Sequence, residues 1–135
     1  MSVLVTDDGF RADDVKTGFV MLGEAANDVA FLDVPSDTAP KSLEGFCKTA
    51  AVIRVDFPSF ADGRGFTIAR QLRRMGFTGR LRARGQLISD QYAMARRCGF
   101  DEVEIGDDLA ARQPEADWIY RAKWQDHDYQ ARVRG

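Results

Sequence analysis

The sequence has few of the residues from which metal- and thiol-dependent sites are built. Among its 135 residues are two cysteines, Cys47 and Cys98, and one histidine, His127. Two cysteines cannot supply a disulfide framework or a four-thiolate zinc site, and one histidine excludes histidine-rich metal sites and most catalytic triads. We expect both cysteines to be inert core thiols and His127 to lie on the surface. No metal site is predicted.

Long apolar runs are also missing. No stretch approaches the about 20 residues of a membrane-spanning helix, and the N-terminus, Met1-Ser-Val-Leu-Val-Thr-Asp-Asp, lacks the basic start and apolar run of a secretory signal. We therefore expect a cytoplasmic protein with no membrane partner. Hydrophobic residues still make up 44% of the chain, which is enough to bury a core without a covalent or metal staple.

Charge is unevenly distributed along the chain. Residues 1–62 carry 5 basic and 11 acidic side chains, whereas residues 63–135 carry 14 basic and 10 acidic ones. Residues 64–99 hold nine arginines, no lysine and a single acid, Asp90. Guanidinium groups bind planar anions and phosphates through two hydrogen bonds at once, so this part of the chain could face an anionic ligand, a nucleic acid or an acidic protein. Five of the arginines are more simply explained as the solvent faces of two helices: Arg70, Arg73, Arg74, Arg96 and Arg97.

Strand-like and helix-like segments alternate from residue 29 onward. We predict strands over 29–33, 51–57, 80–84 and 102–105, and helices over 42–48, 64–75, 88–98 and after Gly106, the last of them broken at Pro114. Gly76 and Gly99 are expected to end two of these helices. Such alternation predicts an α/β domain over 1–135 with four βα units and a mainly parallel sheet, either open or half-barrel-like. Residues 1–28 form a short N-terminal β segment, 29–113 the βα units and 114–135 a C-terminal tail, in which Trp118, Tyr120, Trp124 and Tyr129 pack on the body or on a second copy.

The predicted strands are apolar on one face and charged on the other. Ile53 and Val55 share a face, and alternate residues of the later strands repeat the pattern. The opposite face carries Arg54, Asp56, Arg82, Arg84 and Glu104. Charges in a dry core cost several kcal/mol unless they are paired. We expect this face to be wet, to pair internally, or to meet a ligand or another subunit.

Ligands of parallel α/β folds bind beyond the carboxyl ends of the strands. Asp56 and Arg84 lie there, and Asp56 is our candidate catalytic residue. The loop after the second strand, with Asp62, Gly63, Arg64 and Gly65, could hold an anion at a helix N-terminus; it could equally be a capped turn that needs glycine. Asp90 and Gln91 open the next helix in the same relative place, where Gln91 could bind a ligand or satisfy loop carbonyls.

Several segments resemble one bacterial domain family of unknown function. They are Val55-Asp-Phe-Pro-Ser-Phe-Ala-Asp-Gly-Arg-Gly-Phe66, Gly76-Phe-Thr-Gly-Arg-Leu-Arg-Ala-Arg-Gly85, Asp90-Gln91 and Arg97-Cys-Gly-Phe-Asp101. Members of that family are often encoded beside sulfite reductase and are labelled as oxidoreductases linked to sulfite reduction. The resemblance, which covers roughly residues 50–105, implies a role in sulfur assimilation.

These observations favour an accessory protein of assimilatory sulfite or sulfate reduction. It would dock on the reductase or its electron donor, or bind a small oxyanion at Arg64, Arg82 and Arg84. The alternative is a cofactor-independent acid–base enzyme, with Asp56 beside Arg54 and Arg84. No flavin, nicotinamide, iron–sulfur or haem motif is present, so we predict no cofactor. The pI of about 5.4 disfavours a nucleic-acid partner, and open sheet edges favour a homodimer.

Overall fold

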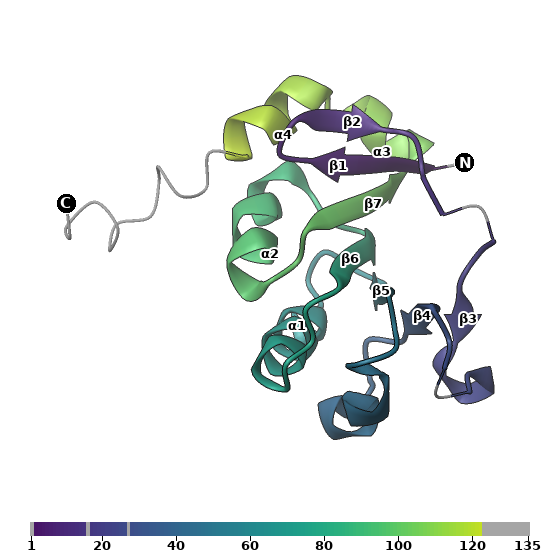
Figure 1. The fold of residues 1–135 in the computed structure, drawn as a ribbon. Coiled ribbons are helices and arrows are strands. Elements are labelled where there is room, and N and C mark those ends of the chain that lie inside the picture. The colour runs from purple at the N-terminus through teal and green to yellow at the C-terminus, as the bar shows by residue number, and fades with distance from the viewer. Residues whose placement is uncertain (1, 16, 27, 123–135) are drawn as a thin grey trace, which may run out of the picture.

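The computed structural model describes residues 2–15, 17–26 and 28–122. It contains a mixed α/β fold around one seven-stranded sheet (Figure 1). In spatial order the strands are β2 (Gly9–Arg11), β1 (Ser2–Thr6), β7 (Glu102–Gly106), β6 (Arg80–Gly85), β5 (Val52–Phe57), β4 (Phe31–Val34) and β3 (Val20–Met21). Strands β3 to β7 pair in parallel, whereas β1 is antiparallel to both β7 and β2. The predicted α/β class, the mainly parallel sheet and an N-terminal β segment are confirmed.

Helices follow most of the strands. They are η1 (Leu22–Glu24), η2 (Pro40–Phe46), α1 (Arg64–Arg74), η3 (Ser89–Gln91), α2 (Tyr92–Cys98), α3 (Asp107–Arg112) and α4 (Glu115–Arg121), where η marks a 3-10 helix. Gly76 and Gly99 adopt positive φ angles of 96° and 111° directly after α1 and α2, as a glycine that ends a helix does. Pro114 separates α3 from α4, as predicted.

One face of the sheet makes the hydrophobic core with α1 and α2, which lie on the same side of it (Figure 1). Ile53, Val55, Leu81 and Ala83 on that face are fully buried. Helix α1 contributes Ile68, Ala69 and Leu72 to the same cluster, because these positions recur on one side of a 3.6-residue helix. The apolar half of the strand pattern is therefore confirmed.

Three short elements differ from the prediction. The helix expected over 88–98 begins with the 3-10 helix η3, and α2 starts only at Tyr92. The segment expected to be an α-helix over 42–48 is the 3-10 helix η2, which begins at Pro40. Strand β3 was not expected, and its two residues are defined only by pairing with Leu32 and Asp33 of β4. The four repeated βα units and the half-barrel outline remain predictions.

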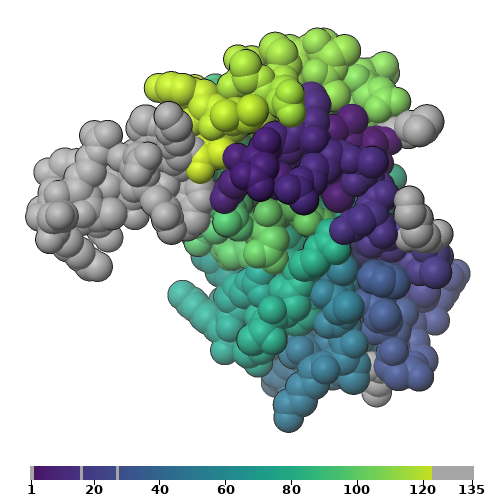
Figure 2. Space-filling model, turned by 45° about the horizontal axis from the view of Figure 1, so that its top comes forward, coloured from purple at the N-terminus to yellow at the C-terminus, as the bar shows by residue number. Residues whose placement is uncertain are grey.

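The N-terminal hairpin of β1 and β2 forms one edge of the sheet, and the last helix, α4, packs against it. Figure 2 shows β1 and β2 beside α4 on one surface of the molecule. The backbone N–H of Phe10 in β2 donates a hydrogen bond of 2.8 Å to the Glu115 carboxylate of α4. Trp118 of α4 is fully buried and makes an edge-on contact with Tyr92 of α2, with ring centroids 6.1 Å apart. This part of the predicted tail thus packs on the body, whereas Tyr120 is exposed.

Candidate functional site

The register of the parallel strands arranges the charged residues in two rows across the sheet. One row runs Asp33, Arg54, Arg82 and Glu102, from β4 to β7. The next row runs Asp56, Arg84 and Glu104, nearer the carboxyl ends of the strands. All seven residues lie on the sheet face opposite the core, because side chains alternate along each strand.

Arg82 is the centre of an ion-pair network. Its guanidinium donates to Glu102 at 2.7 Å and to Glu104 at 2.9 Å, and its side chain has no exposed surface. Glu104 also accepts a hydrogen bond from Arg54 at 3.0 Å, and Arg54 donates to Asp33 at 2.7 Å. Burial would lower the pKa of Arg82, but the neighbouring carboxylates, Glu102 first, outweigh burial and raise it. The charged face therefore pairs internally, which is one of the three arrangements that the sequence left open.

Residues between β2 and β3 cover this network. Asp13 accepts a hydrogen bond from Arg82 at 3.1 Å, and Asp14 accepts hydrogen bonds from Arg80 at 3.0 Å and from Arg82 at 3.2 Å. The Phe19 ring lies 3.9 Å from the Arg54 guanidinium carbon, a cation–π distance. The hydrogen bond from Arg80 is the main cause that lowers the pKa of Asp14. The acidic N-terminal part of the chain thus partners its arginine-rich middle part.

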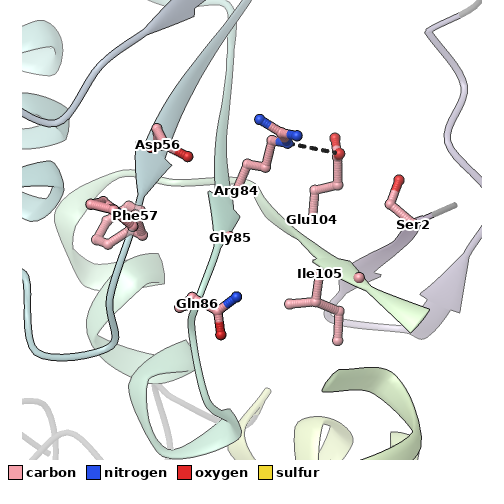
Figure 3. Close-up of a pocket in the computed structure, with 10 residues that line it drawn as sticks. Ser2, Asp56, Phe57, Arg84, Gly85, Gln86, Glu104 and Ile105 are labelled. Carbon is pink, nitrogen blue, oxygen red and sulfur yellow. Dashed lines mark ion pairs between the residues drawn. The ribbon is translucent and has the colours of Figure 1, made fainter. Parts of the chain in front are cut away.

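Beyond this covered region, the carboxyl ends of the strands border an open hollow of about 470 Å³. Figure 3 shows Asp56, Arg84, Glu104 and Ser2 along its wall, contributed by β5, β6, β7 and β1. Arg84 keeps 49% of its side chain exposed, and its only ion pair within the described residues joins Nε to Glu104 at 3.5 Å. Among the residues that line this hollow, Arg84 is therefore the arginine with hydrogen-bond donors available to a ligand.

A second, smaller hollow of about 160 Å³ adjoins the first. Asp56 and Arg84 line both of them, and Met21, Asp33, Val34 and Pro35 complete the second. Asp56 is half-buried and has no hydrogen-bond or ion-pair partner within the part of the chain that the structure describes. The structure thus brings Asp56 and Arg84 of the predicted site together.

Arg54 and Arg82 do not reach this hollow as free groups. Both guanidiniums are committed to carboxylates, and Arg82 presents no surface to a ligand. Arg64 lies apart from the hollow: it borders a separate depression of about 300 Å³ with Ser36 and Thr67. The three arginines predicted to bind one oxyanion therefore occupy three different surroundings.

The loop before α1 is organised by an internal ion pair. Arg64 donates to Asp62 at 2.7 Å and to the Ser36 hydroxyl at 3.1 Å. The hydrogen bonds from Arg64 lower the pKa of Asp62 to about 2. Gly65 is buried against the Phe57 ring, with no room there for a Cβ atom, whereas Gly63 is exposed. Helix α1 begins after Gly63 without a side-chain cap, and neither Gly63 nor Gly65 has a positive φ angle. Packing against Phe57, and not the turn, therefore requires glycine at position 65.

Asp90 and Gln91 make local contacts. Asp90 pairs with Arg121 of α4 at 2.7 Å. The Gln91 side chain accepts a hydrogen bond from the Ile88 N–H at 3.0 Å and donates one to the Phe60 carbonyl at 2.7 Å. Gln91 therefore satisfies loop backbone groups, as the simpler interpretation of this residue predicted.

The remaining candidate residues differ in how far the structure describes them. Cys98 is buried and Cys47 is partly buried, and burial raises the pKa of both thiols, so both stay protonated and poorly nucleophilic at neutral pH. His127, Trp124 and Tyr129 lie outside the described residues. Among the described residues, no cluster of His, Cys, Asp and Glu side chains could hold a metal ion, and no helix has the length and apolar character of a membrane span.

Sequence reasoning missed the residues that cover the charged face. Each of these residues contacts an arginine more than 60 positions away: Asp14 contacts Arg80, and Asp13 and Phe19 contact Arg82. The signal available was the charge asymmetry between the two parts of the chain, which we assigned to an external anion or partner. Part of that asymmetry is neutralised inside the molecule.

Comparisons with known proteins identify a family and no named relative. No curated protein and no solved structure matches the chain. One family matches residues 32–135, which span the sheet from β4 to β7 and all of the residues that line the two hollows except Ser2 and Met21. The chain belongs to this family, described as "Bacterial protein of unknown function (DUF934)".

Proposed function

We propose that the chain is an accessory protein of assimilatory sulfite reduction that binds a small oxyanion at Arg84. The observation that carries the proposal is the half-exposed Arg84 guanidinium at the wall of the 470 Å³ hollow. An arginine fork with free N–H groups can give an oxyanion two charge-assisted hydrogen bonds. The link to sulfite rests on the family resemblance of the segments around residues 55–101.

The place of the hollow supports binding. It lies where parallel strands β5, β6 and β7 end, which is where parallel α/β folds hold their ligands. Its volume falls in the range of small-molecule sites. The ion pairs of Arg54 and Arg82 hold strands β5, β6 and β7 together beside it, so the wall that carries Arg84 is rigid before a ligand arrives.

Titration of the isotope-labelled chain with sulfite, sulfate and phosphate tests oxyanion binding by NMR. We expect saturable shifts at the backbone amides of Arg84 and Gln86, and their loss in Arg84→Gln. Arg74→Gln on the exposed side of α1 is the matched control, since it removes the same charge far from the hollow. Absence of binding by all three anions would overturn the proposal.

Docking on the reductase system is a separate part of the proposal. Pull-down of sulfite reductase and of its electron donor with the immobilised chain tests it. We expect retention of one of the two proteins, weakened at high salt because surface charges contribute to such contacts. Retention of neither would remove this part and leave oxyanion binding standing.

A cofactor-independent acid–base enzyme is the second candidate function. It is favoured by Asp56, a carboxylate without a partner among the described residues that lies opposite Arg84 in the strand register. In this case Asp56 would take a proton from a substrate anchored at Arg84. Sulfite assimilation that is unchanged in a strain carrying Asp56→Asn would eliminate this candidate.

We also propose that the chain forms a homodimer in the cytoplasm. Support comes from edge strand β3, whose Val20 and Met21 are 37% and 49% exposed, because an apolar open edge favours pairing with another strand. Light scattering at micromolar concentration should give the mass of two chains, and Met21→Lys should shift it toward one. A monomeric mass for the unmodified chain would contradict the proposal.

A further inference from the structure

We infer that Asp56 makes this site selective for oxyanions that carry a proton of their own, against fully deprotonated ones. The ligand class is thus a protonated, singly charged tetrahedral or pyramidal oxyanion, such as dihydrogen phosphate or hydrogensulfite. The inference rests on the proposed function, because it assigns a role to the residue that faces the proposed anchor. It goes further by naming which anions the hollow accepts and which it rejects.

The geometry places an acceptor beside a donor. Asp56 and Arg84 are register partners on β5 and β6, so their side chains leave the sheet on the same face. They do not pair with each other: the Arg84 guanidinium is turned toward Glu104 on β7, while Asp56 stands on the other side of it (Figure 3). Both residues line both hollows. A ligand between them meets a cation on one side and a carboxylate on the other.

The chemistry of the free carboxylate sets the requirement. An ionised carboxylate has acceptor sites only, so Asp56 can form a hydrogen bond only with a ligand that brings an O–H or N–H group. Glu104 differs from Asp56, since its oxygens already accept from Arg54 and Arg82. A fully deprotonated oxyanion placed on Arg84 would set its own oxygens against Asp56 with no proton between them.

The charge balance of the whole face acts in the same direction. Four guanidiniums of the described residues, those of Arg54, Arg80, Arg82 and Arg84, face five partnered carboxylates. Asp56 adds a sixth carboxylate. The face therefore carries no surplus of positive charge to hold a dianion, whereas a monoanion that donates a hydrogen bond to Asp56 is held at both ends.

Sulfate and phosphate form the matched pair of probes, because both are small tetrahedral oxyanions and only phosphate carries a proton near neutral pH. Calorimetry or NMR titration of the 135-residue chain at constant ionic strength gives both affinities. One charge-assisted hydrogen bond gained or lost corresponds to about tenfold in affinity. In buffer below the second pKa of phosphate, where the monoanion dihydrogen phosphate predominates, we expect phosphate to bind the unmodified chain at least about tenfold more tightly than sulfate.

Asp56→Asn should reverse or abolish this preference, because the amide can donate a hydrogen bond to sulfate. Asp28→Asn is the control, an exposed aspartate far from both hollows. Thermal unfolding of Asp56→Asn checks that the fold is retained, as expected for a half-buried side chain without a partner among the described residues.

The outcomes separate the two proposals. Equal affinities for the two anions in the unmodified chain, unchanged in Asp56→Asn, would overturn the selectivity and leave oxyanion binding intact. Absence of binding by both anions in both chains would overturn both. Tighter sulfate binding by Asp56→Asn than by the unmodified chain would support the role of Asp56.

Discussion

Arg82 and Glu104 form a 2.9 Å ion pair in the middle of the sheet, with no exposed surface on the arginine side chain. Each of these residues also binds a second oppositely charged side chain, Glu102 and Arg54 respectively. The pairs cross three strands, β5, β6 and β7. In a region of low dielectric such a network tolerates no missing member, because the partner left behind would be a buried and uncompensated charge.

Arg82→Met should therefore destabilise the fold by about 3–5 kcal/mol. The methionine fills the space but removes the hydrogen bonds that Arg82 donates to Glu102 and Glu104. Urea unfolding monitored by circular dichroism measures the loss. Arg74→Met on the exposed side of α1 is the control and should change stability by less than about 0.5 kcal/mol. Equal effects of the two substitutions would show that the network contributes little to stability.

Acid should weaken the ion pairs that join Asp13 and Asp14 to the arginines of the charged face. Burial alone would raise the pKa of Asp13, but hydrogen bonds from Val15 and Arg82 outweigh it and lower the pKa; the hydrogen bond from Arg80 lowers that of Asp14. Groups with a lowered folded-state pKa stabilise the fold above their unfolded value of about 4 and lose this effect as pH falls below it. The free energy of unfolding should thus decrease below about pH 4, as urea titrations at several pH values would show.

The double variant Asp13→Asn, Asp14→Asn separates these two groups from the other carboxylates. It should be less stable than the unmodified chain at neutral pH and should lose less of its stability below about pH 4. Asp28→Asn serves as control, with the pH dependence of the unmodified chain. If the free energy of unfolding had the same pH dependence in the double variant and the unmodified chain, the ion pairs of Asp13 and Asp14 would not contribute to stability.

Gly65 and Gly63 should respond differently to the same substitution. A Cβ atom at Gly65 would overlap the buried Phe57 ring, whereas at Gly63 the nearest atom is Cδ2 of Phe66 at 3.9 Å. Gly65→Ala should cost about 1–3 kcal/mol through overpacking, and Gly63→Ala less than about 0.5 kcal/mol. Thermal or urea unfolding of both variants measures this. Similar costs would mean that packing against Phe57 is not the reason for glycine at position 65.

Tyr92 joins α2 to the N-terminal hairpin through a 2.6 Å hydrogen bond from its hydroxyl to Asp7. Tyr92→Phe should cost about 1 kcal/mol. Burial, followed by the hydrogen bond to Asp7, raises the pKa of Tyr92. Its stabilising effect is therefore complete below the unfolded value of about 10 and declines as pH rises above it. Urea unfolding in alkaline buffers should show this decline in the unmodified chain and a smaller one in Tyr92→Phe.

Local pattern predicted most of the sheet and the positions of helices α1 and α2. Alternation identified the core residues of β5 and β6, and Gly76 and Gly99 located the helix ends, because both signals lie within a few residues of what they determine. The pair Asp56 and Arg84 was predicted at the strand ends for the same reason, since parallel register brings such positions together.

Features that depend on distant contacts were not predicted. Asp13 meets Arg82 across 69 positions, and nothing local at Asp13 marks it as a partner of a buried arginine. Strand β3 has two residues, too few for a periodicity, and exists through its pairing with β4. The same limit explains why Arg54 and Arg82 were grouped with Arg84 as ligand-binding residues: sequence gives the face of a side chain but not what covers it.

The hydrogen bond between Phe10 and Glu115 makes the two edge strands of the sheet, β2 and β3, differ in how readily they can pair with another strand. On β2 the Glu115 carboxylate occupies the Phe10 N–H that an incoming strand would need, while β3 exposes Val20 and Met21. If copies associate through β3 about a twofold axis, each chain then has no second free edge, so growth stops at a pair. In that arrangement the fold would disfavour open-ended fibre formation.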